Sequence, residues 1–226
     1  MQEGNPQQRS VPWTTRDVWL GVLACGMWLA GAILFAAFML LLSWQIDLGL
    51  FVILWELPLV IPAWWFTVRK YNVGWRALGV QGFSAEILGI GLGLMILSMG
   101  LNLVSSLVLS QFNLQAQMDF VALFQELSSP WLLLVGGIVV APVVEELVFR
   151  GFVFAGLRER YGWWKAGLIS AGIFAVIHLQ PLAVIQILVL GMIFAYLYHR
   201  SGSIWPAVIM HVLTNAVGLG VAYLLS

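Results

Sequence analysis

Charged residues are scarce in this chain of 226 amino acids. Asp, Glu, Lys and Arg make up only 9% of the sequence, and ten acids balance ten bases. A soluble globular protein carries about 25% charged residues, and a nucleic-acid-binding domain concentrates basic residues on one face. The scarcity of charge therefore excludes a soluble enzyme, a disordered chain and a basic nucleic-acid-binding protein.

Cysteine is almost absent as well. The single cysteine, Cys25, lies within an apolar stretch. One cysteine excludes an intramolecular disulfide and a zinc site made of cysteines. We interpret Cys25 as a small apolar residue on a helix.

Long apolar runs occupy most of the chain, and 62% of its residues are hydrophobic. The runs cover residues 18–43, 51–68, 87–110, 131–158, 165–179, 181–198 and 204–225. They must be helical, because backbone groups in lipid are satisfied only within a helix or a closed barrel, and the sequence lacks the alternation of a barrel. We predict an all-α polytopic membrane protein with about seven transmembrane helices. Residues 18–226 form one domain, and residues 1–17 form a polar lead-in.

The basic residues are distributed unevenly between the two ends of these helices. Nine of the ten fall in segments that the alternation of runs places on one side of the membrane: Arg9, Arg16, Arg69, Lys70, Arg76, Arg158, Arg160, Lys165 and Arg200. The positive-inside rule then predicts a cytoplasmic N-terminus and a C-terminus outside. Short loops and the lack of an organellar transit signal favour a bacterial inner membrane.

Three predicted helices carry ionisable or amide side chains within their apolar runs. They are Glu145, Glu146 and Arg150 in the fourth run, His178 in the fifth, and His211 and Asn215 in the seventh. A charge within the bilayer costs about 2.5–3.5 kcal/mol, so these residues are candidates for function. Counted at about 1.5 Å per residue from the basic ends of the helices, Glu145 and His178 lie roughly 20 Å deep and His211 roughly 12 Å. We therefore predict one polar cavity between the fourth, fifth and seventh helices.

The two adjacent glutamates differ in their surroundings. Glu146 and Arg150 are four residues apart and share a helix face, so they can pair and neutralise each other. Glu145 points about 100° away and has no partner on its own helix. A carboxylate in this setting, near a histidine, suits a general base. The alternative is a glutamate that only packs between helices.

The remaining polar residues allow more than one interpretation. His211 and Asn215 are four residues apart, and their N–H groups suit an oxyanion site. A membrane histidine can instead form a hydrogen bond between helices, and for His178 both interpretations stay open. We interpret His199 as an interfacial residue. Glu56, which two prolines follow, is expected to bond to a kinked backbone and has no catalytic role.

Three motifs occur in order along the chain: Glu145-Glu146-x-x-x-Arg150, Phe174-x-x-x-His178 and His211-x-x-x-Asn215. Together they resemble the intramembrane CAAX-processing and bacteriocin-immunity proteases, a family that includes the prenyl-protein endopeptidases. The family pattern has a Glu-Glu-x-x-x-Arg motif, a Phe-x-x-x-His motif and a His-x-x-x-Asn or Asp motif on three membrane helices. The resemblance covers residues 131–220, and the N-terminal half shares only its hydropathy.

The resemblance implies an intramembrane endopeptidase. Its substrate would be a membrane-associated protein or peptide, with a prenylated one as a candidate. Glu145 would activate a water that His178 helps to orient, and His211 and Asn215 would stabilise the tetrahedral oxyanion. The expected partners are this substrate and the lipid bilayer, with no nucleic acid.

The same resemblance assigns supporting roles and leaves a metal open. Glu146 and Arg150 would fix their helix, and Phe174 would pack beside the site. The family has commonly been labelled metalloprotease, and zinc would find three ligands with an open fourth position in Glu145, His178 and His211. Hydrolysis driven by the glutamate needs the same residues without a metal. We favour the metal-free scheme and keep zinc as the alternative.

Two further function classes are compatible with these residues. A non-catalytic bacteriocin-immunity or membrane-binding protein could use the same scaffold. A small transporter could use Glu145 and the histidines as a proton relay, but the chain shows no inverted repeat of the kind that transporters often carry. We therefore predict the endopeptidase and keep the non-catalytic protein as the alternative.

Overall fold

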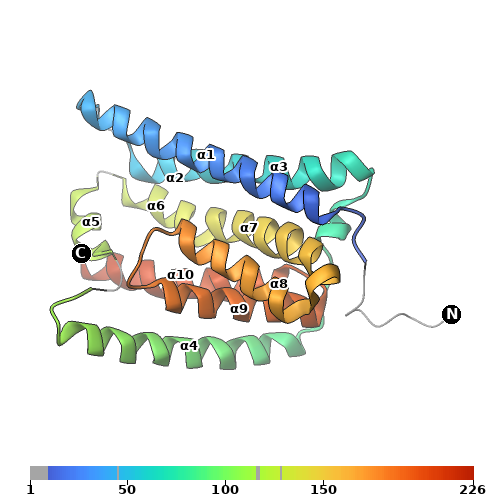
Figure 1. Ribbon diagram of the computed structural model, residues 1–226. Coiled ribbons are helices and arrows are strands. Elements are labelled where there is room, and N and C mark those ends of the chain that lie inside the picture. The colour runs from blue at the N-terminus through green and yellow to red at the C-terminus, as the bar shows by residue number, and fades with distance from the viewer. Residues whose placement is uncertain (1–9, 45, 116–117, 128) are drawn as a thin grey trace.

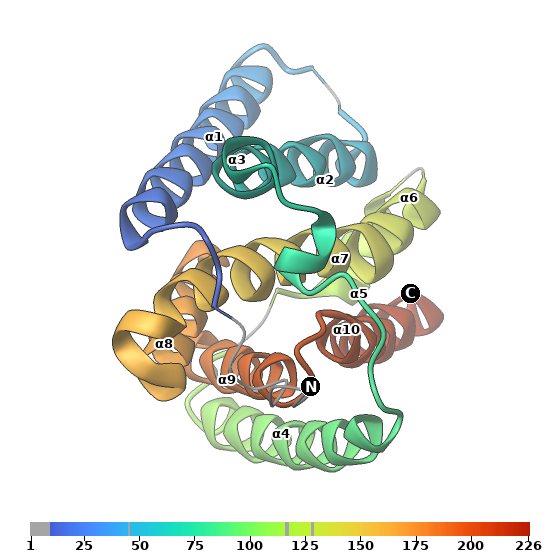
Figure 2. The same cartoon turned by 90° about the vertical axis from the view of Figure 1, so that its right-hand side faces the viewer.

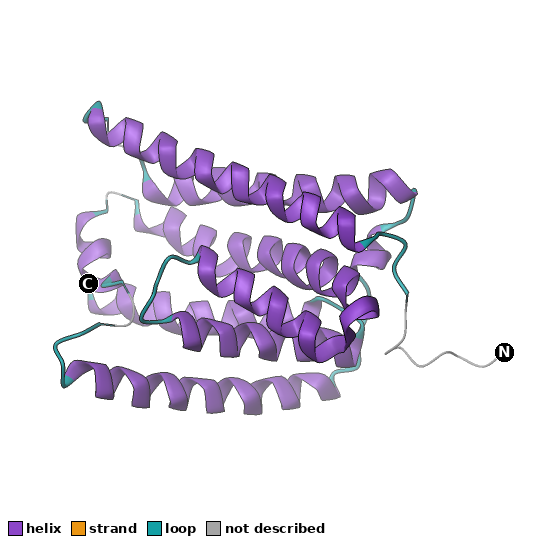
Figure 3. Cartoon of the chain, viewed as in Figure 1, coloured by secondary structure: helices purple, strands orange, loops and turns teal. Residues whose placement is uncertain are grey.

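The computed structural model describes residues 10–44, 46–115, 118–127 and 129–226 of the chain. Over this part the protein is helical, with loops and no β-strand, which confirms the all-α prediction (Figure 3). The α-helices are α1 (Thr15–Leu41), α2 (Leu48–Glu56), α3 (Val60–Trp64), α4 (Glu86–Ser110), α5 (Phe120–Glu126), α6 (Pro130–Val135), α7 (Ala141–Glu146), α8 (Ala155–Ile177), α9 (Val184–Ser201) and α10 (Trp205–Leu225). Short 3-10 segments are η2 (Leu57–Leu59) and η4 (Trp75–Leu78), and π-helical segments are η3 (Trp65–Arg69), η5 (Gly136–Val140) and η6 (Leu147–Phe154).

Several helices begin and end at residues that satisfy their free backbone groups. At the start of α1, the Thr14 hydroxyl accepts the Asp17 N–H, and the Asp17 carboxylate accepts the Thr14 N–H, which is a capping box. At the starts of α2 and α5, one carboxylate oxygen of Asp47 and of Asp119 accepts the N–H of the residue three positions later. Helix α9 ends at Gly202, whose φ of +66° is a left-handed conformation that glycine adopts without strain. These polar residues fix the helix ends.

Six helical stretches are long and apolar enough to cross a membrane in the described chain. The fourth, Pro130–Ile177, has 48 residues, and a straight helix of that length would be more than twice as long as the bilayer core, which is about 30 Å thick. It is broken at Gly162, which has φ +72° and ψ +164°. The chain reverses there (Figure 1), so the two arms correspond to the predicted fourth and fifth runs. The seven predicted runs are thus six helical stretches, one of them folded into two arms.

The helices form three groups when the bundle is viewed from one end. Helices α1, α2 and α3 lie on one side, α4 lies on the opposite side, and α6 to α10 lie between them (Figure 2). Helix α1 starts at the end of the bundle opposite to the end of α10 (Figure 1). The α3–α4 connection, the reversal in α8 and the α9–α10 connection all lie where α1 starts. The predicted basic segments therefore gather at one end, and the side of the membrane that this end faces stays a prediction.

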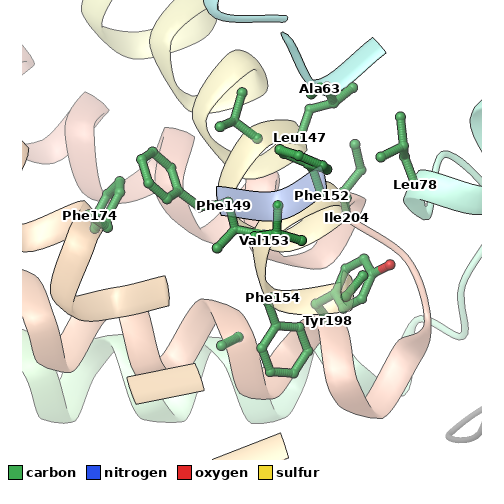
Figure 4. Close-up of a cluster of buried hydrophobic side chains, with 14 of the residues drawn as sticks. Ala63, Leu78, Leu147, Phe149, Phe152, Val153, Phe154, Phe174, Tyr198 and Ile204 are labelled. Carbon is green, nitrogen blue, oxygen red and sulfur yellow. The ribbon is translucent and has the colours of Figure 1, made fainter. Parts of the chain in front are cut away.

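The largest hydrophobic cluster surrounds the π-helical segment η6. Phe152 and Phe154 are fully buried within it, and the Phe154 ring lies beside the Tyr198 ring (Figure 4). Phe154 packs edge-on against Tyr198 of α9, with ring centroids 5.7 Å apart. Gly151 lies so close to η4 that a Cβ atom would stand 2.6 Å from the Leu78 carbonyl oxygen. Every residue of η6 is buried, so this segment places Arg150 inside the bundle.

The predicted polar lead-in is partly packed against this cluster. Its first nine residues lie outside the described part of the chain. Trp13, 3% exposed, donates its indole N–H to the Phe152 carbonyl at 3.1 Å. A Cβ atom on Gly156 would approach the Trp13 nitrogen to 2.5 Å, so glycine makes room for the indole. Asp17 bonds Lys70 and raises the pKa of that amine above its ordinary value.

Candidate active site

Four charged or titratable side chains from two helices and η6 meet inside the bundle. Glu145 and Glu146 end α7, Arg150 lies in η6, and His211 lies in α10. All four are buried, and the side chains of Glu146 and Arg150 have no exposed surface. Because isolated charges in a low-dielectric interior are costly, their contacts with one another decide whether the arrangement is stable.

Glu146 binds the two basic members of this cluster through one oxygen. Its Oε1 atom lies 3.1 Å from Nη1 of Arg150, so the ion pair predicted from the four-residue spacing is present. The same Oε1 atom lies 2.9 Å from Nδ1 of His211. A carboxylate paired with arginine accepts hydrogen bonds and does not donate them. We therefore assign the Nδ1 proton to His211, with Glu146 as the group that orients the ring.

His211 also faces the second glutamate. Its Nε2 atom lies 3.5 Å from Oε2 of Glu145, so one imidazole connects both carboxylates. Glu145 has no charged partner on its own helix, as expected. The histidine that faces Glu145 is His211, which the resemblance assigned to the oxyanion, whereas it gave His178 the role of orienting the water. The gap between Oε2 and Nε2 is longer than a direct hydrogen bond.

Arg150 is held by a carbonyl and by aromatic rings. Its Nη2 atom donates to the Gly191 carbonyl on α9 at 3.2 Å. The guanidinium lies over the rings of Phe174, Phe194 and Phe149, at 4.6, 5.2 and 5.9 Å from their centroids. Aromatic faces attract cations, most strongly where water is excluded. The charge is therefore balanced by Glu146 and enclosed by rings, which fits its predicted role in fixing the helix.

His178 lies at the edge of the cluster. It caps the C-terminal end of α8, with Nδ1 at 2.6 Å from the Phe174 carbonyl oxygen. Since a carbonyl only accepts, Nδ1 carries the proton and Nε2 is left as an acceptor. The Phe174 ring lies 4.6 Å from the His178 ring and 5.8 Å from the His211 ring. No hydrogen bond or ion pair joins His178 to the two glutamates or to His211 among the described residues.

Asn215, one turn after His211, contacts the fourth span. Its Nδ2 atom donates to the Gly137 carbonyl at 2.8 Å. In the wide turn η5 the Ala141 N–H bonds the Gly136 carbonyl, five residues earlier. The next donor in this pattern would be Pro142, which has no N–H, so the Gly137 carbonyl lacks that partner. Asn215 supplies it and keeps a second N–H.

The predicted zinc ligands do not form a metal site in this arrangement. No group of three His, Cys, Asp or Glu side chains is placed to hold a metal ion within the described ranges. Glu145 and His211 face each other, but in the described chain no ion pair or hydrogen bond links His178 to either of them, and its Nδ1 atom bonds the Phe174 carbonyl. A three-ligand zinc site made of Glu145, His178 and His211 therefore does not fit the side chains as they lie.

The sequence did not predict the role of Phe194, and it predicted a contact of Glu56 that the structure does not show for one carboxylate oxygen. Phe194 of α9 is 1% exposed and stacks on His211, with centroids 4.9 Å apart and planes 23° apart. Its sequence context is an ordinary apolar run, which gives no signal of this contact. Glu56 ends α2, which packs against α7, the helix that carries Glu145. The Oε2 atom of Glu56 is buried without a hydrogen-bond partner in the described chain, so this atom does not form the predicted backbone bond.

Comparison with known proteins agrees with the motifs. Residues 127–217, which include every predicted site residue, match the family model "Type II CAAX prenyl endopeptidase Rce1-like". The chain is 33% identical over 103 residues to "Putative membrane peptidase YdiL" of Bacillus subtilis, over 46% of this chain and 40% of that protein. It is 31% identical over 86 residues to "Uncharacterized 24.3 kDa protein" of Escherichia coli, over 36% of this chain and 40% of that protein.

The matches confirm the family resemblance that the three motifs carry. They cover less than half the length of the two curated relatives. No solved structure matches. With its six candidate spans and its bacterial relatives, the chain is an integral membrane protein.

Proposed function

Since residues 127–217 carry the signature of the CAAX prenyl endopeptidase family, we propose that the protein is an intramembrane endopeptidase. It hydrolyses a peptide bond of a membrane-associated protein, with a prenylated protein as the candidate substrate. The observation that carries the proposal is the buried His211, which connects Glu146 on one side and Glu145 on the other. A base, an oriented imidazole and an unpaired amide N–H are the groups that water-driven peptide hydrolysis needs.

Glu145 is the proposed general base. A water that binds both its Oε2 atom and Nε2 of His211, beside the 3.5 Å gap that separates them, gives a proton to the carboxylate as its oxygen attacks the scissile carbonyl carbon. The carbonyl π electrons move to oxygen and form the tetrahedral oxyanion. Glu145 then passes its proton to the departing amine as the C–N bond breaks, which restores the carboxylate.

Glu146 acts on this step through His211. Its carboxylate holds the Nδ1 proton, as a buried aspartate orients the histidine in a serine-protease triad. In this tautomer Nε2 accepts the second hydrogen of the attacking water, and the second N–H of Asn215 donates toward the oxyanion. His178 offers Nε2 as an acceptor at the edge of the site, where it can bind a substrate N–H or a second water.

The test uses purified protein in lipid vesicles and a quenched fluorescent peptide that is anchored to the bilayer by a prenyl group. Glu145→Gln is expected to lower the cleavage rate by at least about a hundredfold, because the base is lost. Glu86→Gln is the matched control, since Glu86 is an exposed glutamate at the start of α4. Glu145→Gln protein that cleaves at the wild-type rate would refute the assigned base. Wild-type protein that cleaves neither prenylated nor unprenylated anchored peptides would favour the non-catalytic alternative.

A further inference from the structure

One phenylalanine outside the three motifs contacts two members of the charged cluster. Phe194 stacks on the His211 imidazole and lies 5.2 Å beneath the Arg150 guanidinium. These are the two basic groups that share Oε1 of Glu146. The ring is 1% exposed, so both contacts form away from solvent. Phe194 therefore touches both basic partners of the carboxylate that orients the proposed catalytic histidine.

The stacking geometry adds a second restraint on the terminal torsion of His211, beside its hydrogen bond to Glu146. The terminal torsion of a histidine is broad and nearly two-fold, so the ring can tilt or turn over. Nδ1 and Nε2 point at Glu146 and Glu145 in only one orientation of the ring plane. A flat aromatic face 4.9 Å away and nearly parallel opposes tilting of this plane. An aliphatic side chain of similar size would fill the space without defining a plane.

A second ring supports His211 from another direction but has other contacts. Phe174 meets the His211 ring edge-on at 81°, and it also packs against His178. Its loss would disturb both histidines. Phe194 has no ring contact with His178 among the described residues, so of the two site histidines its ring contacts only His211, and it also packs among apolar side chains such as Leu197 and Met210.

From these contacts we infer that Phe194 is a positioning residue, which holds the His211 imidazole in the orientation that joins Glu145 to Glu146. This inference rests on the proposed function, because the orientation matters for turnover only if His211 serves the reaction. Aromatic pairs contribute energy beyond the area that they bury, and the stacked geometry is one of the preferred ones.

The kinetic test compares three variants in vesicles. Phe194→Leu is expected to lower kcat about tenfold while KM stays near the wild-type value, because a stacking contact of this size corresponds to that factor. Phe194→Tyr keeps the ring and should restore most of kcat. Phe154→Leu is the matched control, since Phe154 is equally buried and its ring contacts Tyr198 and Arg158. If Phe154→Leu lowers kcat as much as Phe194→Leu, the effect is a general loss of packing and the inference is wrong.

A spectroscopic test does not depend on turnover. The chain has three histidines, so ring-labelled histidine gives few NMR signals, which His178→Gln and His199→Gln assign. In Phe194→Leu the His211 ring signals are expected to shift as the ring current disappears, and to broaden as the ring gains mobility. Unchanged His211 signals would overturn the inference. If these signals respond and no variant cleaves peptide, the positioning contact stands and the proposed function fails.

Discussion

Glu146 and His211 lie 65 residues apart in the sequence, and Oε1 of the first is 2.9 Å from Nδ1 of the second. Helices α7 and α10 place these residues together at the centre of the bundle. Glu146 also pairs with Arg150, four residues later in the same span. Its hydrogen bond to His211 therefore links this ion pair to α10. The same carboxylate thus stabilises a buried cation and orients the imidazole that faces Glu145.

Glu146 should matter more for stability than Glu145. Glu146→Gln leaves Arg150 buried without its counter-charge, and breaking a buried pair in this way costs about 3–5 kcal/mol. Glu145→Gln removes a carboxylate without an arginine partner, and we expect it to lower the unfolding free energy much less. Thermal or denaturant unfolding in detergent measures both variants. Equal loss of stability in the two would contradict the division of roles between the glutamates.

Asn215→Leu should lower both stability and activity. The substitution removes the hydrogen bond to the Gly137 carbonyl, and bonds of this kind between membrane helices contribute about 1 kcal/mol. If the second N–H serves the oxyanion, kcat falls by roughly a hundredfold. Thr214→Val is the control, since the Thr214 hydroxyl bonds the Met210 carbonyl of its own helix. A loss of stability with an unchanged kcat would remove Asn215 from the reaction.

That Glu145 and His211 come together could be predicted from the sequence, and the rotation of the helices about their axes could not. Insertion costs and apolar run lengths placed Glu145 and His211 at overlapping depths, and the four-residue spacing predicted the Glu146–Arg150 pair. Which histidine faces Glu145 depends on how α8 and α10 turn about their axes, and this is set by packing. The sequence therefore could not distinguish His178, which bonds the Phe174 carbonyl of its own helix, from His211, which faces Glu145.

Local deviations of the backbone were also invisible in the sequence pattern. The apolar runs ended at residue 158 and resumed at 165, but a single glycine within that gap, Gly162, reverses the chain. In the wide turn η5, the Gly137 carbonyl is free to accept the side-chain N–H of Asn215 from α10, and nothing in the sequence indicated this bond. Phe194 has the hydropathy of its neighbours, and its contact with His211 exists only in three dimensions.

Gly162→Ala should destabilise the protein although the site is spacious. No atom lies within 4 Å of a Cβ built on Gly162, so the penalty comes from the backbone, whose φ of +72° with ψ of +164° is almost restricted to glycine. Such strain costs about 1–3 kcal/mol. Gly172→Ala, at an equally open helical position, should instead stabilise by about 0.5–1 kcal/mol. Unfolding midpoints that move in the same direction for both variants would show that the reversal at Gly162 is wrong.

Trp13→Phe tests the attachment of the N-terminal segment. The change keeps an aromatic ring and removes the hydrogen bond to the Phe152 carbonyl, so we expect a loss of about 1 kcal/mol in unfolding free energy. The exposed Trp19 on α1 provides the control substitution, Trp19→Phe. Faster proteolysis near residue 13 in the first variant alone would support the attachment. Identical stability and proteolysis of both variants would contradict it.

The central claim is that Glu145 and His211 act as one unit, and a double-mutant cycle on cleavage of the membrane-anchored peptide tests it most directly. Residues that act as a unit in catalysis give strongly non-additive losses. We predict that Glu145→Gln combined with His211→Ala is scarcely slower than either variant alone. Losses that multiply in the double variant, or a His211→Ala enzyme that turns over at the wild-type rate, would contradict the claim.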